Sequence, residues 1–178
     1  MDDKITTQIA TQAQKAYQNE DYQGAASLFL EAAQAALENN DPLVAAEMQN
    51  NRSVALLKAG DAENAYKAAE GTDQTFASAG DFDRQGMAFG NQAAAFEAMG
   101  EIERAIQAYQ QASDLFKQTG NKELRAYVLK SLSALQVRSG HQFEALATMQ
   151  AALDSKPKLT LRERVLKKLL QTPFQTPK

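Results

Sequence analysis

The sequence repeats itself at an interval of 40 residues, and this period limits the folds open to the chain more than any other feature. Sliding the chain by 40 residues aligns an alanine in each of four copies, at Ala25, Ala65, Ala105 and Ala145. Further columns align without insertion or deletion: the two-residue turn before this alanine, and the positions twelve before it, four after it and seven after it. Such a period indicates stacked units, each of which buries its apolar face against its neighbours.

The best-preserved copy, Asp83 to Ala112, shows how one unit is built. It contains two patterns of helical period on either side of a turn at Gly100-Glu101. Glycine favours the end of one helix, and an acidic residue favours the start of the next. Small side chains mark the positions where two helices approach closely, and large apolar side chains lie between them. The small residues are Ala93, Ala105 and Ala112, and the large ones are Phe89, Phe96, Ile102, Ile106 and Tyr109.

Extended over the four copies, this pattern predicts an all-α solenoid of helix-turn-helix repeats in one domain of residues 1–158. The repeats span about 3–40, 41–80, 81–120 and 121–157. Each repeat is an antiparallel helix pair. The predicted pairs are 3–18 with 21–39, 42–59 with 61–79, 82–99 with 101–119, and 121–139 with 141–154.

A ninth helix is predicted at 159–171, followed by a disordered tail at 172–178 that contains two prolines. Leu161, Val165 and Leu169 lie on one line of this helix, with Leu166 and Leu170 beside it, and charged residues occupy its other face. We expect a C-terminal capping helix, whose apolar line covers the end of the last repeat, because a solenoid needs its terminal apolar face covered.

The second copy departs from the other three. Ala69 replaces a large residue, Thr72 replaces alanine, and Gly71 lies in the middle of the predicted helix 61–79, at a cost of about 1 kcal/mol. We expect this helix to be the least stable of the central ones, or to receive an apolar side chain from a partner.

Composition excludes several classes of function. The chain has no cysteine and one histidine, so thiolate metal sites, cysteine nucleophiles and multi-histidine sites are absent. We therefore expect no enzyme activity, no metal and no cofactor. No apolar run reaches the ~18 residues of a spanning helix, which favours a cytoplasmic protein. Residues 1–153 carry 20 acidic and 12 basic side chains, which argues against nucleic acid as a partner. Membrane contact is expected at most through the basic segment 162–168.

The columns of small and aromatic residues around each turn resemble the tetratricopeptide repeat (TPR) family over roughly residues 5 to 157. The 40-residue unit is similar to the subgroup found in kinesin light chain and the spindle-orientation adaptors, and the match is best at Asp83-Arg84 and Met87 to Ala93. This resemblance implies a right-handed solenoid and a role in protein–protein interaction. The first helix of every repeat would then line the concave side.

A ladder of short hydrogen-bonding side chains lies fourteen residues before the column alanines: Thr11, Asn51, Asn91 and Ser131. A carboxamide can both donate to and accept from a peptide backbone, and the resemblance implies that Asn51 and Asn91 hold a ligand in this way. The alternative is that they make hydrogen bonds between helices or face water. Lys58, Lys130 and Arg138 are candidates to pair with an acidic peptide. The full candidate set is Thr11, Gln14, Asn50, Asn51, Val54, Lys58, Met87, Asn91, Tyr127, Lys130, Ser131 and Arg138.

These observations predict a non-catalytic adaptor or scaffold that binds a peptide or a helix of a partner protein in the concave groove. One alternative is a structural subunit that assembles a larger complex through its outer or end surfaces. Another is a regulator whose solenoid closes on a small ligand. The sequence slightly favours a monomer.

Overall fold

The helices form where the 40-residue columns place them. In a computed structural model, residues 3–171 are described, and they contain ten helices and no strand. The first helices of the four repeats are α1 (Asp3–Gln18), α3 (Pro42–Lys58), α6 (Phe82–Met99) and α8 (Lys122–Arg138). The second helices are α2 (Tyr22–Glu38), the pair α4 (Ala62–Ala69) and α5 (Thr72–Ser78), α7 (Ile102–Thr119) and α9 (Gln142–Ser155). The last helix is α10 (Leu161–Gln171).

Side chains of aspartate or asparagine fix the start of five of the ten helices in the described residues. Asp41, Asp61 and Asp81 each accept a hydrogen bond from the backbone N–H three residues later, at the start of α3, α4 and α6. Asp21 and Asn121 do the same at α2 and α8. These bonds satisfy backbone donors that have no partner inside the helix, which is why the predicted corners agree with the observed ones.

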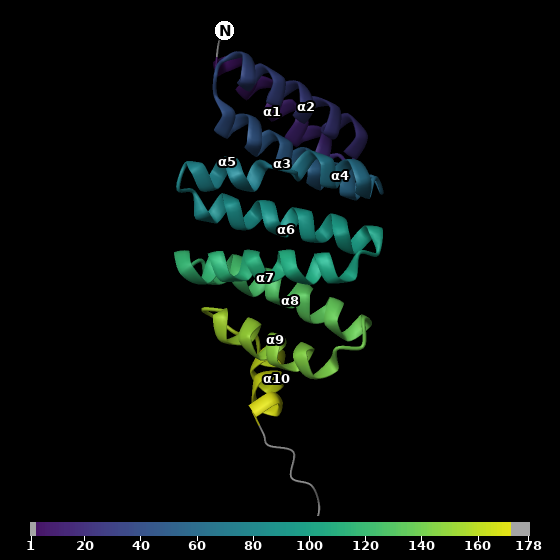
Figure 1. The fold of residues 1–178 in the computed structure, drawn as a ribbon, viewed down its shortest axis with the longest axis vertical. Coiled ribbons are helices and arrows are strands. Elements are labelled where there is room, and N and C mark those ends of the chain that lie inside the picture. Colours follow the sequence, from purple (N-terminus) through teal and green to yellow (C-terminus); the bar gives the residue numbers. More distant parts are fainter. Residues whose placement is uncertain (1–2, 172–178) are drawn as a thin grey trace, which may run out of the picture.

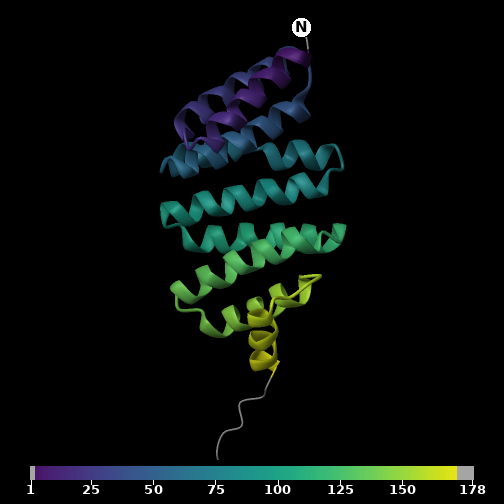
Figure 2. The same cartoon turned by 180° about the vertical axis from the view of Figure 1, so that it is seen from behind.

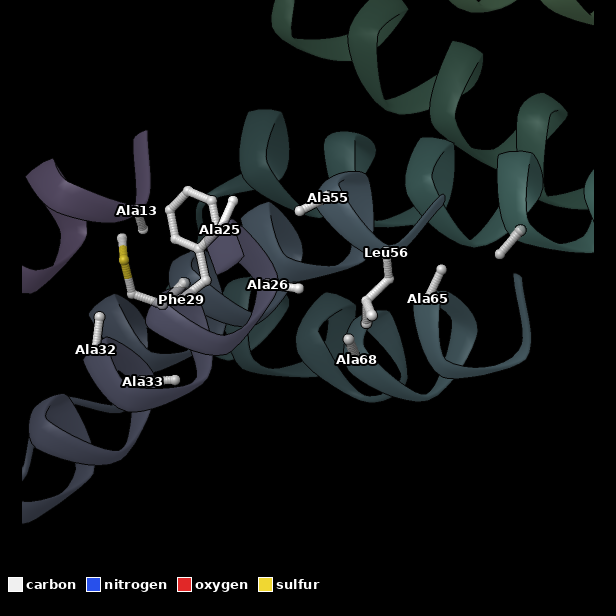
Figure 3. Close-up of a cluster of buried hydrophobic side chains, with 12 residues drawn as sticks. Ala13, Ala25, Ala26, Phe29, Ala32, Ala33, Ala55, Leu56, Ala65 and Ala68 are labelled. Atoms are coloured by element: carbon white, nitrogen blue, oxygen red, sulfur yellow. The ribbon is translucent and has the colours of Figure 1, made fainter. Parts of the chain in front are cut away.

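The helix pairs stack in chain order into a right-handed α-solenoid, with α1 and α2 at one end and α10 at the other (Figures 1 and 2). The alanine column that defines the repeat is buried throughout: Ala25, Ala65, Ala105 and Ala145. Figure 3 shows the core of the N-terminal half, where Phe29 lies among small side chains that let the helices approach closely. Tyr66 joins this cluster to the core of the C-terminal half, since its ring centroid lies 4.7 Å from that of Phe96.

The prediction of one continuous helix over 61–79 is wrong. The helix stops after Ala69, Glu70 takes an extended conformation, and α5 begins at Thr72. Gly71 has a φ of +76°, which lies in the left-handed region that side chains with a Cβ rarely adopt. Gly71 therefore lies between two shorter helices and not, as expected, inside one helix.

Helix α10 lies at the predicted place, but its apolar line does not cover the last repeat as expected. Leu161, Val165 and Leu169 are 72%, 54% and 66% exposed, and none of the residues of α10 is buried. Both views show α10 running across the direction of α9 (Figures 1 and 2). The expected disordered tail at 172–178 lies outside the described residues.

Candidate functional site

The first helices border three clefts, and seven of the twelve candidate residues line them. The N-terminal cleft, of about 700 Å³, lies between α1 and α3. The central cleft, of about 640 Å³, lies between α6 and α8 and reaches Leu57 of α3. The C-terminal cleft, of about 800 Å³, lies between α8, α9 and α10. These volumes are in the range of sites that bind ligands in proteins.

The candidates divide unevenly among the clefts. Thr11, Gln14 and Asn51 line the N-terminal cleft, Ser131 and Arg138 line the central one, and Tyr127 and Lys130 line the C-terminal one. Asn50, Val54, Lys58, Met87 and Asn91 line none of the three.

The two asparagines of the ladder have different surroundings. The side chain of Asn91 donates a hydrogen bond of 3.0 Å to Oδ1 of Asn50, which is buried one repeat earlier. For Asn91, this hydrogen bond between two helices is the alternative to ligand binding that was left open above. Asn51 is half-buried at the edge of the N-terminal cleft, and its amide makes no hydrogen bond to any residue between 3 and 171. Its donor and acceptor are therefore both available to a ligand.

The hydroxyl of Thr11, at the first position of the ladder, is already used. It donates a hydrogen bond of 2.8 Å to the carbonyl oxygen of Thr7, one turn earlier in α1. A threonine hydroxyl that bonds within its own helix still has lone pairs, so Thr11 can accept a further hydrogen bond in the N-terminal cleft.

Glu97 organises the charges of the central cleft. Its carboxylate accepts a hydrogen bond of 3.0 Å from the hydroxyl of Tyr109 and forms an ion pair with Arg138 of the next repeat. Burial of the phenol, and then the nearby charge of Glu97, raise the pKa of Tyr109 well above its usual value, so the phenol stays protonated as a donor. Arg138 is therefore not an unpaired cation for a ligand, because Glu97 already balances its charge.

The remaining candidate cations are unpaired. Lys58 and Lys130 are exposed and form no ion pair within the described part of the chain. Lys130 lies beside the exposed ring of Tyr127 in the lining of the C-terminal cleft. Each exposed lysine contributes little to binding unless a ligand covers it, because water screens its charge.

Sequence reasoning missed Lys15, which lines the N-terminal cleft together with Asn51. In the other three copies its column holds Ala55, Ala95 and Leu135, which are all buried. Comparison of the columns therefore gave no signal for a surface cation at this place. Lys15 is exposed because no earlier helix pair of the described chain lies against α1.

Residues 3–171 contain candidates neither for a metal-binding group nor for a membrane-spanning helix. No group of three or more His, Cys, Asp or Glu side chains in residues 3–171 is arranged to hold a metal ion. Within the same range, none of the helices is both long enough and apolar enough to span a bilayer.

Comparison with solved structures shows the same fold. The chain is similar to BtubC (BKLC) from P. vanneervenii, with a TM-score of 0.76 and 20% identity over 92% of this chain and 70% of that one. It is also similar to a protein designated a kinesin light chain, with nearly identical TPR-like repeats, from Podosopora anserina. There the TM-score is 0.74 at 16% identity, over 93% of this chain and 81% of that one. The predicted TPR-like solenoid is confirmed.

The sequence itself points to a family. No curated protein matches the chain in sequence. Residues 5–168, however, match the family described as soluble NSF attachment protein, SNAP, a range that begins in α1 and ends in α10. With this match and the repeat solenoid taken together, the chain belongs to the soluble NSF attachment protein (SNAP) family.

Proposed function

We propose that the protein is a non-catalytic adaptor, which holds an extended peptide or a helix of a partner protein along the face lined by α1, α3, α6 and α8. The N-terminal cleft is the main binding site in this proposal. The observation that carries it is Asn51, whose free amide lies at the edge of a cleft of about 700 Å³. Repeat solenoids use such extended concave surfaces to bind chains of other proteins.

The lining of the N-terminal cleft suits a peptide. Its floor is apolar and includes Phe29, Val44 and Met48. Its rim is polar and includes Gln14, Lys15 and Asn51. An apolar floor accommodates a side chain of the ligand, while rim amides pair with its backbone N–H and C=O groups.

The charged residues around the N-terminal cleft restrict the kind of peptide that it can bind. Glu47 also lines the N-terminal cleft, but Arg84 forms an ion pair with it at 3.1 Å. Lys15 has no such partner within residues 3–171, so the free charge on the rim is positive. We infer that the preferred segment carries an apolar side chain next to an acidic one. Nucleic acid is not part of this proposal, and the cytoplasm is its compartment.

The test begins with peptides selected from a random library against the wild-type chain. Asn51→Ala is expected to weaken their binding about 5- to 10-fold, the effect of roughly one lost hydrogen bond of 1–1.5 kcal/mol. Adding Asn91→Ala is expected to weaken peptide binding little further, because the amide of Asn91 already donates to Asn50 and Asn91 lines none of the clefts. Asn19→Ala is the matched control, because Asn19 is exposed outside the clefts.

A photo-crosslinking residue at Gln14 locates the peptide independently. The expected result is a crosslink from Gln14 and none from the same residue placed at Gln107, which is exposed on the second helix α7. Peptides that bind Asn51→Ala with wild-type affinity and do not crosslink to Gln14 contradict the proposal. Circular dichroism of each variant separates loss of binding from loss of fold.

A further inference from the structure

Helix α10 is docked against the array through the side that carries Glu163 and Lys167. Glu163 accepts a hydrogen bond from Nζ of Lys156 at 2.6 Å, and Lys167 forms an ion pair with Asp154 of α9 at 2.5 Å. These contacts hold the side of α10 opposite to Leu161, Val165 and Leu169. Those three residues, which we name the α10 stripe, lie one turn apart and are all exposed.

Cations border the α10 stripe. At 100° per residue, Arg162 lies beside one edge of the stripe, and Arg164 and Lys168 lie beside the other. The one acidic residue of α10, Glu163, lies on the docked side and is bonded to Lys156. The exposed surface of α10 is therefore apolar along its centre and positive at both edges. A partner for it needs an apolar strip with acidic neighbours.

Such a surface exists at the opposite end of the same chain. A small cleft of about 220 Å³ lies between α1 and α2, and we name it the end cleft. Ile5, Ile9 and Ala35 supply its apolar part, and Ile5 is 44% exposed. Glu31 and Glu38 are exposed beside it, and the cleft lining includes no Lys or Arg.

The α10 stripe cannot reach the end cleft of its own chain. The first helix pair and α10 lie at opposite ends of the stacked array, with all the other helices between them (Figures 1 and 2). The two surfaces can therefore meet only between two molecules. Lysine and arginine at the edges of one and glutamate beside the other make that meeting electrostatically favourable.

Two other occupants fit less well. Pairing of α10 with α10 of a second copy places Arg162, Arg164 and Lys168 opposite the same cations, which repel. An anionic membrane attracts these cations too, but residues 1–153 carry 20 acidic against 12 basic side chains and are repelled by it. The end cleft fits better than either, because it offers an apolar surface to the α10 stripe and glutamates to the cations beside the stripe.

We propose that the protein associates head to tail, with the α10 stripe of one molecule in the end cleft of a second copy. Leu161, Val165 and Leu169 contact Ile5 and Ile9, and Arg162 and Arg164 lie opposite Glu31 and Glu38. A contact between two different surfaces leaves both ends of the dimer open, so further copies add in a row. One short helix forms a small interface, so the association is weak and sensitive to salt. It uses neither the N-terminal nor the central cleft and does not depend on the adaptor role.

Sedimentation velocity of the full chain tests this proposal, from about 10 µM to about 1 mM in low salt, a range that covers weak interfaces. The expected result is a mean mass that rises with concentration and falls when salt is added. The tail variant Arg162→Glu with Arg164→Glu, and the head variant Glu31→Lys with Glu38→Lys, are each expected to lose at least 10-fold in association constant. All four side chains are exposed, and circular dichroism checks that each variant is folded.

An equimolar mixture of the two variants is the decisive sample. The unchanged α10 of the head variant meets the unchanged end cleft of the tail variant, so association is expected to return. Lys117→Glu with Lys122→Glu is the matched control, because it changes net charge as the tail variant does, at exposed sites between the two ends. This control is expected to associate at low salt.

Three results overturn the proposal. The first is a wild-type chain that stays monomeric up to about 1 mM, a concentration at which weak interfaces are populated. The second is a head variant that still associates while the tail variant does not, which shows α10 pairing with α10. The third is a monomeric chain that sediments with phosphatidylserine vesicles, which shows a lipid surface as the occupant.

Discussion

The side-chain amide of Gln92 in α6 donates a hydrogen bond of 3.1 Å to the carbonyl oxygen of Ala69, at the point where the second helix of repeat two breaks. In an unbroken helix this carbonyl would accept from the backbone N–H of Asp73. Gln92 also donates to the carboxylate of Asp73 at 2.9 Å, and the hydroxyl of Thr72 donates to the Ala69 carbonyl at 2.7 Å. Side chains thus replace the helical bond that the break removes.

We predict that Gln92→Ala destabilises the protein by about 1–3 kcal/mol, because it leaves buried polar groups at the break with one donor fewer. Gln92 is buried, so water cannot take its place without rearrangement. Urea unfolding gives the free energy, and Gln107→Ala, an exposed change in α7, is the control. A Gln92→Ala chain within about 0.5 kcal/mol of wild type, the range of an ordinary surface change, contradicts this account.

The same break shows what the sequence can and cannot predict. The alanine column and the corner residues predict the helix pairs, because burial of Ala65 and capping by Asp61 depend on local pattern. Gly71 indicated a weak point in the second helix. The hydrogen bonds made at the break come from Gln92 of the following repeat, and periodicity within one helix carries no information about that contact.

For the candidate site too, the sequence predicts the positions of residues but not the contacts between repeats. Position in the repeat determines which side of α3 Asn51 lies on, and in the structure Asn51 lines the N-terminal cleft. The ladder column could not show that Asn91 pairs with Asn50, since that bond joins two first helices. For α10, the pattern correctly predicted an amphipathic helix but wrongly predicted that its apolar line docks, because the ion pairs of Glu163 and Lys167 lie on the docked side instead.

Two glycines of α6 are predicted to respond to alanine with opposite signs. A Cβ at Gly86 would lie 2.8 Å from Cε1 of the buried Phe116 ring, whereas at Gly90 the nearest atom is Cγ1 of Val128 at 3.8 Å. Replacing glycine by alanine inside a helix stabilises the helix by about 1 kcal/mol, but overpacking of a buried site costs about 1–3 kcal/mol.

Gly90→Ala is therefore expected to raise the free energy of unfolding by up to about 1 kcal/mol. Gly86→Ala is expected to lower it by about 1–2 kcal/mol, the overpacking cost less the gain in helix propensity. Each glycine is the control for the other in urea unfolding. Equal shifts of the same sign show that contact with Phe116 does not decide the outcome.

Gln136 is predicted to be a site where a substitution stabilises the fold. Its Oε1 is buried and receives no hydrogen bond from the described residues. The same column holds Leu56 and Phe96 in the two repeats before it, both buried. An unpaired buried acceptor is costly, so Gln136→Leu is expected to raise the free energy of unfolding by about 1 kcal/mol. Thermal unfolding measures this, with the exposed Gln142→Leu as control. A lower midpoint for Gln136→Leu than for wild type contradicts the prediction.

The docking of α10 is predicted to weaken in acid. The hydrogen bond from Lys156, and then the backbone N–H of Thr160, lower the pKa of the Glu163 carboxyl from its usual 4.5 to about 2. A carboxyl whose pKa is lowered by folding stabilises the folded form at any pH above its unfolded value, and this contribution is lost as the pH falls through its folded value. Docking through Glu163 is thus complete above about pH 4.5 and declines toward pH 2.

The Asp154 carboxyl must be removed from this measurement, because its ion pair with Lys167 also lowers its pKa and also holds α10. In an Asp154→Asn background, the methyl NMR signal of Leu166, in the C-terminal cleft, reports whether α10 is docked. We expect the signal to move toward its undocked position as the pH falls from about 4.5 to 2, the interval between the two pKa values. With Glu163→Gln added, it is expected to lie near that position already at pH 6 and to change little on acidification. A signal that titrates equally with and without Glu163 assigns the transition to another carboxyl group.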